Sequence, residues 1–276
     1  MKLLVIGGNG MAGHLLVHYF RTVEGIHVAH TTRRSDDREG IPLDASDLEQ
    51  VLAVVTAHRP DIIVNAAGVL NADAEQHPIA AYQVNGLLPH WLRHAADTMG
   101  ARLIHISSDC VFSGSKGRYT EQDTPDNPTV YGRTKALGEV TDPRHLTIRT
   151  SIIGPDQNPA GIGLLQWFLK QTGTIQGYSR VYWNGVTTLE LAKAVHYAIQ
   201  HPEIGGLVQL AAPEVVSKHE LLHLFQAAFD HYKASIIRVD TPIIDRTLAP
   251  MRTDWNYKAS HYPQMLSELA AWMRST

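Results

Sequence analysis

The chain has 276 residues, of which 44% are hydrophobic and 18% are charged, a composition typical of a globular protein with one or two domains. The formal net charge is −3 and no apolar run approaches the ~20 residues of a membrane span, which argues against nucleic-acid binding through basic residues and against membrane insertion. Cys110 is the only cysteine, so an intrachain disulfide is impossible and a reducing cytoplasm is the expected location.

Short β-branched runs alternate with longer amphipathic runs through the first 150 residues. Strands joined by crossover helices predict an α/β fold, a Rossmann-type doubly wound parallel sheet with helices on both faces. We predict strands at 3–6, 26–30, 61–65, 102–107 and 145–149, and helices at 11–21, 48–58, 80–99 and 130–140.

After Ser151 the pattern changes, because glycines and prolines cluster and the predicted helices at 189–200 and 218–232 are joined by irregular segments. We therefore expect a smaller, partly interleaved C-terminal lobe that binds the substrate. The predicted division assigns 1–150 with 188–212 to a dinucleotide-binding domain and 151–187 with 213–276 to the substrate lobe.

A glycine pattern, Gly7-x-x-Gly10-x-x-Gly13, follows the first strand and opens the first helix. A tight turn at this position brings the backbone close to a pyrophosphate, which then lies at the helix N-terminus. No Lys-Ser/Thr pair follows, so the pattern is not a P-loop. Its place between a strand and a helix favours a dinucleotide site over a simple tight turn, with Asn9 and Met11 beside the phosphates.

The end of the second strand carries Arg33 and Arg34 where an acidic residue would indicate NAD. Two guanidinium groups suit a 2′-phosphate, so NADP(H) is the preferred cofactor and NAD(H) remains possible. The alternative is a solvated basic loop. Asp44 is expected at the adenine edge, and the NAAG segment is expected beside the cofactor through Ala66, Ala67 and Gly68.

The pattern Tyr131-x-x-x-Lys135 places a phenol and an ammonium group on one helix face, and Ser108 ends the strand before that helix. A neighbouring ammonium group favours the phenolate, so we expect a lowered Tyr131 pKa and acid–base catalysis by this side chain. Ser108 would hold a substrate carbonyl, and Lys135 would also bind the nicotinamide ribose. Alone the spacing is common on surfaces, but here it follows a dinucleotide loop and a strand-end serine.

These motifs resemble the extended short-chain dehydrogenase/reductase superfamily, and the block SSDCVFSG…GRYTEQDTP…YGRTKALGE resembles its dTDP-4-dehydrorhamnose reductase family. The resemblance implies reduction of a 4-keto group on a nucleotide-linked 6-deoxysugar by a monomer or homodimer. Ser108, Tyr131 and Lys135 occupy the positions of the family's catalytic triad. Candidate substrate contacts are Val69, Asp109, Cys110 and Asn184.

The chain departs from the family pattern where Ile152-Ile153 replaces an aromatic residue and Val186 replaces a proline, so the sugar and the nucleotide stay open. Cys110 leaves an epimerase–reductase as one alternative, although a small buried cysteine fits the pattern better. A non-catalytic regulatory subunit is the other alternative, because a methionine adenosyltransferase subunit resembles the same family.

The segment HELLH (219–223) matches a zinc-protease pattern on a predicted helix. Helical periodicity turns His219 and His223 away from the apolar face, and Ser217 with Glu220 forms a capping-box pattern that accounts for the glutamate. His90 and His94 share the spacing but have no acidic or cysteine partner nearby in sequence. We therefore predict no metal site.

Overall fold

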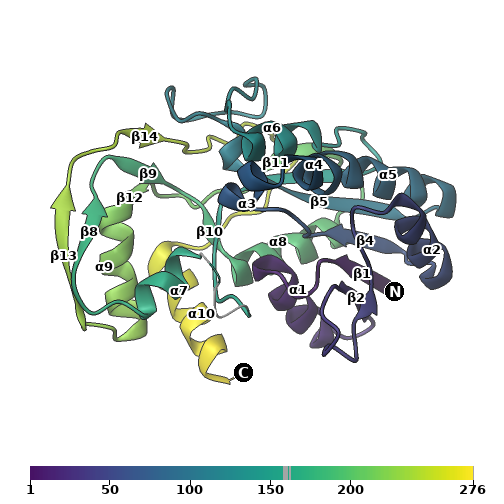
Figure 1. The fold of residues 1–276 in the computed structure, drawn as a ribbon, viewed down its shortest axis with the longest axis horizontal. Helices are drawn as coiled ribbons and strands as arrows, with labels where there is room; N and C mark the ends of the chain where they lie inside the picture. The colour runs from purple at the N-terminus through teal and green to yellow at the C-terminus, as the bar shows by residue number, and fades with distance from the viewer. Residues whose placement is uncertain (158–160, 162, 276) are drawn as a thin grey trace.

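The computed structural model describes residues 1–157, 161 and 163–275. Its centre is a seven-stranded parallel sheet in the order β11-β6-β5-β4-β1-β2-β3 (Figure 1). The strands are β1 (Lys2–Ile6), β2 (His27–Thr32), β3 (Ile41–Pro42), β4 (Ile62–Asn65), β5 (Arg102–Ser108), β6 (Leu146–Thr150) and β11 (Gly206–Gln209). The predicted α/β class and parallel sheet are confirmed.

Helices cover both faces of this sheet because the strands are apolar on both sides. On β1, Leu3 and Val5 belong to the core that includes α1 and α8, whereas Leu4 and Ile6 belong to the core on the opposite face. The first face carries α1 (Met11–Arg21) and α8 (Thr188–Gln200). The second carries α2 (Leu48–His58), α3 (Asn71–Gln76), α4 (Pro78–Ala81), the π-helical turn η1 (Tyr82–Leu87), α5 (Leu88–Met99) and α6 (Val130–Leu137).

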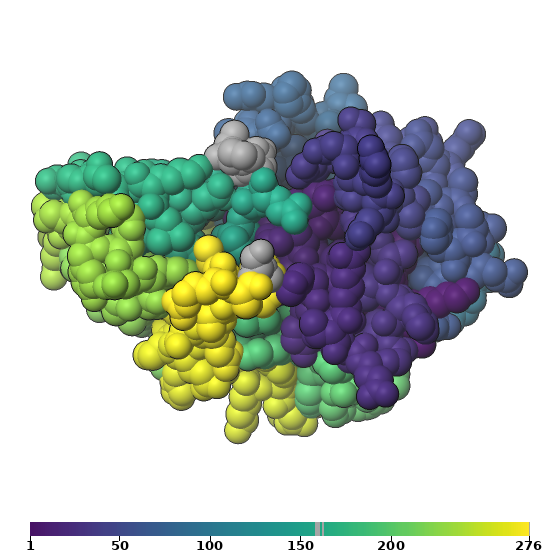
Figure 2. Space-filling view, turned by 90° about the horizontal axis from the view of Figure 1, so that it is seen from below, coloured from purple at the N-terminus to yellow at the C-terminus, as the bar shows by residue number. Residues whose placement is uncertain are grey.

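The remaining elements extend from one side of the sheet domain, as the space-filling view shows (Figure 2). Three small sheets organise the described part of these elements: the parallel pairs β13-β8 and β10-β7, and a three-stranded sheet β12-β9-β14. These elements are β7 (Ile152–Ile153), α7 (Leu164–Leu169), β8 (Gly173–Tyr178), β9 (Val181–Trp183), β10 (Val186–Thr187), β12 (Val216–Ser217), α9 (Lys218–Phe229), β13 (Ala234–Val239), β14 (Ile244–Asp245) and α10 (Tyr262–Ser275). The short η2 turn (Asp109–Val111) instead directly follows β5 and contacts α6. The predicted domain boundaries stay a prediction.

The predicted helices at 11–21 and 48–58 are confirmed to the residue, and the five predicted strands lie within two residues of the observed ones. The predicted helix at 80–99 is divided, because η1 makes a π-helical turn around Asn85. The Asn85 amide explains this turn: it accepts from Val69 N at 2.8 Å and donates to Val69 O at 2.9 Å and Thr134 Oγ1 at 3.1 Å. None of the helices in the described part of the chain is long and apolar enough to cross a membrane.

Candidate active site and glycine turn

The glycine turn joins β1 to α1 by a close approach that side chains would prevent. Gly7 has a φ of +81°, and its N–H donates to Thr31 Oγ1 at 3.0 Å. A Cβ on Gly13 would lie 2.0 Å from the Gly7 carbonyl oxygen. Gly10 is the N-cap of α1 and supplies no side-chain cap, so the first N–H groups of the helix face outward. Such a cradle fits a pyrophosphate.

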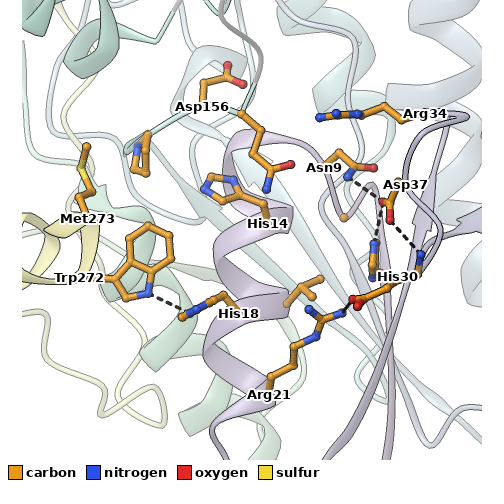
Figure 3. Close-up of a pocket in the computed structure, with 15 residues that line it drawn as sticks. Asn9, His14, His18, Arg21, His30, Arg34, Asp37, Asp156, Trp272 and Met273 are labelled. Carbon is orange, nitrogen blue, oxygen red and sulfur yellow. Dashed lines mark hydrogen bonds and ion pairs between the residues drawn. The ribbon is translucent and has the colours of Figure 1, made fainter. Parts of the chain in front are cut away.

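Asn9 and Asp37 connect the glycine turn to the loop after β2, as Figure 3 shows. Asn9 Nδ2 donates to Asp37 Oδ2 at 2.9 Å, and His30 Nε2 lies 3.0 Å from the same oxygen. The hydrogen bonds from Asn9 and His30 hold the Asp37 pKa far below its usual range. The loop that begins with Arg33 and Arg34 is therefore anchored at the turn.

The two predicted arginines lie in different surroundings. Arg34 lines a groove of about 700 Å³ beside the turn, and its guanidinium group binds the Asp36 carboxylate at 3.0 and 2.7 Å. Arg33 is exposed and acts electrostatically on Asp44. Hydrogen bonds from Ser46, with a smaller effect of Arg33, lower the Asp44 pKa. Among the described residues, no hydrogen bond or ion pair occupies the Arg33 guanidinium group, whereas Asp36 occupies that of Arg34.

The NAAG segment lies against the glycine turn, as the cofactor prediction requires. Ala66 N donates to Ile6 O at 3.0 Å, and a Cβ on Gly7 would lie 2.9 Å from Ala67 Cα. Gly68 follows and is exposed. The remaining predicted contact, Met11, begins α1.

Ser108 and Tyr131 come together although 23 positions separate them in sequence. Ser108 is the last residue of β5, and its hydroxyl donates to Asp109 Oδ1 at 3.2 Å and accepts from Cys110 N at 3.1 Å. Tyr131 lies in the first turn of α6, and its phenol is close enough to Ser108 for that side chain to lower its pKa. Thr129 caps this helix by accepting from Gly132 N at 3.0 Å.

The expected lowering of the Tyr131 pKa is wrong for this structure. Burial raises the Tyr131 pKa, and the neighbouring Cys110 and Asp109 raise it further, whereas the Ser108 side chain opposes them. The reason is desolvation of the phenolate, which is the largest effect on this pKa. The phenol is held in its protonated form.

Lys135 is 4% exposed and extends its ammonium group towards β5. Its Nζ donates to the main-chain oxygen of Ile106 at 2.8 Å. Burial lowers the Lys135 pKa from 10.5 to about 8, and the Glu139 carboxylate opposes this effect. The buried Lys135 amine therefore remains mostly protonated at neutral pH.

Asp109 and Cys110 face two cations that the sequence pattern did not reveal, Lys218 and Arg246. Burial raises the Asp109 pKa, which Arg246 and Lys218 oppose. Arg246 Nη1 lies 3.8 Å from Cys110 Sγ, and Arg246 Nε donates to the oxygen of Phe112 at 2.9 Å. Burial raises the Cys110 pKa to about 12, so the thiol stays protonated near neutral pH.

Lys218 is the first residue of α9, and its Nζ lies 4.5 Å from the centre of the Trp183 ring. Burial lowers the Lys218 pKa to about 8 against the attraction of Asp109. In the part of the chain that the structure describes, neither Lys218 nor Arg246 forms an ion pair with a carboxylate. In the sequence, the one feature that marks Lys218 is its position directly after the capping residue Ser217. No local pattern would have predicted Arg246 at the candidate site.

Two predicted substrate contacts have their polar groups occupied by the protein. Asn184 donates to Leu248 O at 2.8 Å and accepts from Leu248 N at 2.9 Å, and the Val69 main chain binds Asn85. A role of Asn184 or Val69 in binding stays a prediction.

The HELLH segment lies in the first two turns of α9, directly after Lys218. The predicted capping box is confirmed. Ser217 Oγ accepts from Glu220 N at 3.1 Å, while Glu220 Oε2 accepts from Ser217 N at 2.7 Å. Leu221, Leu222 and Phe225 are buried, and His223 is exposed. Residues 1–157, 161 and 163–275 contain no cluster of three or more histidine, cysteine or acidic side chains placed to hold a metal.

Comparisons with known proteins agree with this architecture. Residues 1–243 match the family model described as the RmlD substrate binding domain. The dTDP-4-dehydrorhamnose reductase of Streptomyces griseus is 44% identical over 140 residues, which span 50% of this chain and 43% of that protein. The spore coat polysaccharide biosynthesis protein SpsK of Bacillus subtilis is 30% identical over 79% of this chain and 76% of its own length.

The fold is shared with a solved structure, the dTDP-4-dehydrorhamnose reductase of Bacillus anthracis in complex with NADP. The two chains superpose with a TM-score of 0.83 at 19% identity, covering 100% of this chain and 99% of the other.

Proposed function

The chain belongs to the RmlD substrate binding domain family, and from this premise we propose that it is an NADPH-dependent reductase of a nucleotide-activated 4-keto-6-deoxysugar. The observation that carries the proposal is the meeting of Ser108 with Tyr131, one helical turn from the buried ammonium of Lys135. Ser108 ends β5 and the glycine turn follows β1, so both lie at the carboxyl edge of the same parallel sheet, where open α/β sheets bind their ligands.

The residues fit a dinucleotide. The glycine turn and the uncapped N-terminus of α1 would hold the pyrophosphate, and the NAAG segment would line the cofactor on the other side. Arg33 would bind a 2′-phosphate, because its guanidinium group is exposed while Arg34 is held by Asp36. A bound nicotinamide supplies the hydride for the carbonyl carbon.

Tyr131 would supply the proton for the reduction. Reduction of a ketone requires a proton at the oxygen, and a phenol that stays protonated at neutral pH carries that proton. Ser108 would orient the carbonyl oxygen with its hydroxyl group. The ammonium of Lys135 would stabilise the phenolate that remains after proton transfer.

Lys218 and Arg246 support an anionic substrate. Lys218 and Arg246 both act on the carboxylate of Asp109, and Arg246 also acts on that of Asp126, so two side chains place positive charge beside the candidate site. Such a charge is costly unless a ligand neutralises it. The diphosphate of a nucleotide sugar has the required charge.

The test is turnover of NADPH with freshly prepared dTDP- or UDP-4-keto-6-deoxyhexose by wild type and by Tyr131→Phe. General acid–base catalysis contributes roughly 10²–10⁴-fold, so the variant should lose at least about a hundredfold in kcat. Its affinity for NADPH, measured by cofactor fluorescence, should stay within about twofold, because the phenol is only one of many cofactor contacts.

Tyr178→Phe, which alters an exposed tyrosine on β8, is the matched control and should retain turnover. Unchanged turnover in Tyr131→Phe would reject the mechanism. NADPH binding without turnover of any nucleotide sugar by wild type would instead favour a non-catalytic binding subunit.

A further inference from the structure

Asn127 fastens the segment after Ser108 to the start of the helix that carries Tyr131. Its Nδ2 donates to the main-chain oxygens of Cys110 at 2.8 Å and Phe112 at 3.3 Å. Its Oδ1 accepts from Thr129 N at 3.0 Å, at the N-cap of α6. Asn127 is 8% exposed, so these bonds are largely shielded from water.

The main chain of the same segment adds a second connection. Asn127 N donates to Val111 O at 3.0 Å, and Asp126 N donates to the same oxygen at 3.1 Å. The η2 turn that follows Ser108 is thereby bound to residues 126–129, which lead directly into α6. Asn127 is the side chain that reaches both segments.

The close packing at this junction leaves little room for adjustment. A Cβ on Gly132 would lie 2.6 Å from Asn127 Cβ and 2.7 Å from the Cys110 oxygen. Gly132 directly follows Tyr131, so α6 approaches the η2 turn at the level of the phenol. A change at Asn127 therefore alters the spacing between the strand-end serine and the tyrosine.

We propose that Asn127 is a positioning residue that sets the contact between Ser108 and Tyr131. It would act by holding the η2 turn against the N-terminus of α6, since its side-chain amide is occupied by main-chain groups of those two segments. The proposal rests on the proposed function, because the Ser108–Tyr131 contact matters for catalysis only if these residues act on a carbonyl. Small displacements of catalytic groups lower the rate strongly.

The test compares Asn127→Ala and Asn127→Asp with wild type. Aspartate keeps the acceptor for Thr129 N but loses both donors to the η2 turn, so it separates the two ends of the connection. We expect kcat to fall about tenfold to a hundredfold in both variants, with KM and the NADPH dissociation constant within about twofold. The solvent deuterium isotope effect on kcat should rise, because transfer of the Tyr131 proton becomes slower than other steps.

The turnover rate is divided by the concentration of NADPH-binding sites, so unfolded protein does not lower the measured kcat. Thr147→Val is the matched control, because it also removes two buried hydrogen bonds, from Thr147 Oγ1 to Val140 O at 2.7 Å and from Val140 N to Thr147 Oγ1 at 3.1 Å. Thr147 lies on β6, and its two hydrogen bonds involve neither the η2 turn nor the start of α6. This control should keep the wild-type kcat and isotope effect.

Wild-type kcat per binding site in Asn127→Ala and Asn127→Asp, or the same loss and isotope effect in Thr147→Val, would overturn the positioning role. The Tyr131→Phe measurement keeps this failure distinct from failure of the proposed function. If Tyr131→Phe is inactive while both Asn127 variants are fully active, only the positioning role is rejected. If Tyr131→Phe retains turnover, the mechanism itself is rejected.

Discussion

The ammonium of Lys135 donates a hydrogen bond to the main-chain oxygen of Ile106, with 2.8 Å between the two atoms. This bond holds the ammonium group against the main chain of β5, in a residue that is only 4% exposed. Burial lowers the Lys135 pKa from 10.5 to about 8, a difference equivalent to roughly 3 kcal/mol. The fold therefore holds this charge at a cost in stability, as active sites often do.

Lys135→Met should abolish turnover and stabilise the fold at pH 7. Below pH 8 the lysine is protonated in both states, so wild type bears the full cost of burial. Between about 8 and 10.5 the unfolded chain binds more protons, so the wild-type free energy of unfolding rises with pH. We expect the variant to gain about 2 kcal/mol at pH 7, after losing one hydrogen bond, and the gain to shrink towards pH 10. Urea unfolding at both pH values measures this, and a variant less stable at pH 7 would contradict it.

Glu139→Gln should destabilise the protein strongly. Glu139 and Arg149 form a two-pronged ion pair at 2.9 and 2.7 Å, with side chains only 7% and 2% exposed. Removal of one charge leaves the other buried, which costs about 3–5 kcal/mol. The double variant Glu139→Gln/Arg149→Met should recover much of this loss in urea unfolding. Equal stability of the single variant and wild type would show that Arg149 is neutralised by other groups.

The fold was largely predictable because hydrophobic periodicity is local. The helix at 11–21 and the strands of the large sheet follow from runs that a short window reveals. The pairing of β8 with β13 was not predictable, because residues 173–178 and 234–239 contact each other across a long segment of chain. The π-helical turn at Asn85 depends on bonds to Val69 and Thr134 and has no local signal.

The candidate site was predictable only where a motif spans it. Ser108, Tyr131 and Lys135 lie in one continuous block of sequence, and the structure brings Ser108 to Tyr131. Lys218 and Arg246 come from distant segments, so only the fold places them beside Asp109. The direction of the Tyr131 pKa shift was missed because spacing along a helix carries no information on burial.

Gly13→Ala should abolish cofactor binding, whereas Gly10→Ala should fold normally. A Cβ at position 13 would lie 2.0 Å from the Gly7 oxygen, so the turn must open. At position 10 the nearest atom, the same oxygen, is 3.4 Å away, an ordinary contact. Fluorescence titration with NADPH and thermal unfolding distinguish the two variants. Tight binding by Gly13→Ala would contradict the role given to the turn.

Arg33→Ala should change the choice of cofactor. Loss of a charge-assisted hydrogen bond to a phosphate costs about 1.5–3 kcal/mol, so KM for NADPH should rise roughly tenfold to a hundredfold. KM for NADH should stay nearly constant, because that cofactor lacks the 2′-phosphate. Arg34→Ala should have the smaller effect, since Asp36 already binds its guanidinium group. An equal loss with both cofactors would place Arg33 outside the 2′-phosphate site.

The HELLH segment should contribute to stability and not to a metal centre. Glu220, the general base of the zinc-protease pattern, instead accepts from Ser217 N at 2.7 Å and Ser217 Oγ at 2.9 Å. Ser217→Ala should therefore lower the free energy of unfolding by about 1 kcal/mol. His219→Ala and His223→Ala should keep full turnover before and after treatment with a chelator. One zinc ion per chain in the purified protein, with turnover lost on chelation and absent from both histidine variants, would reverse this assignment.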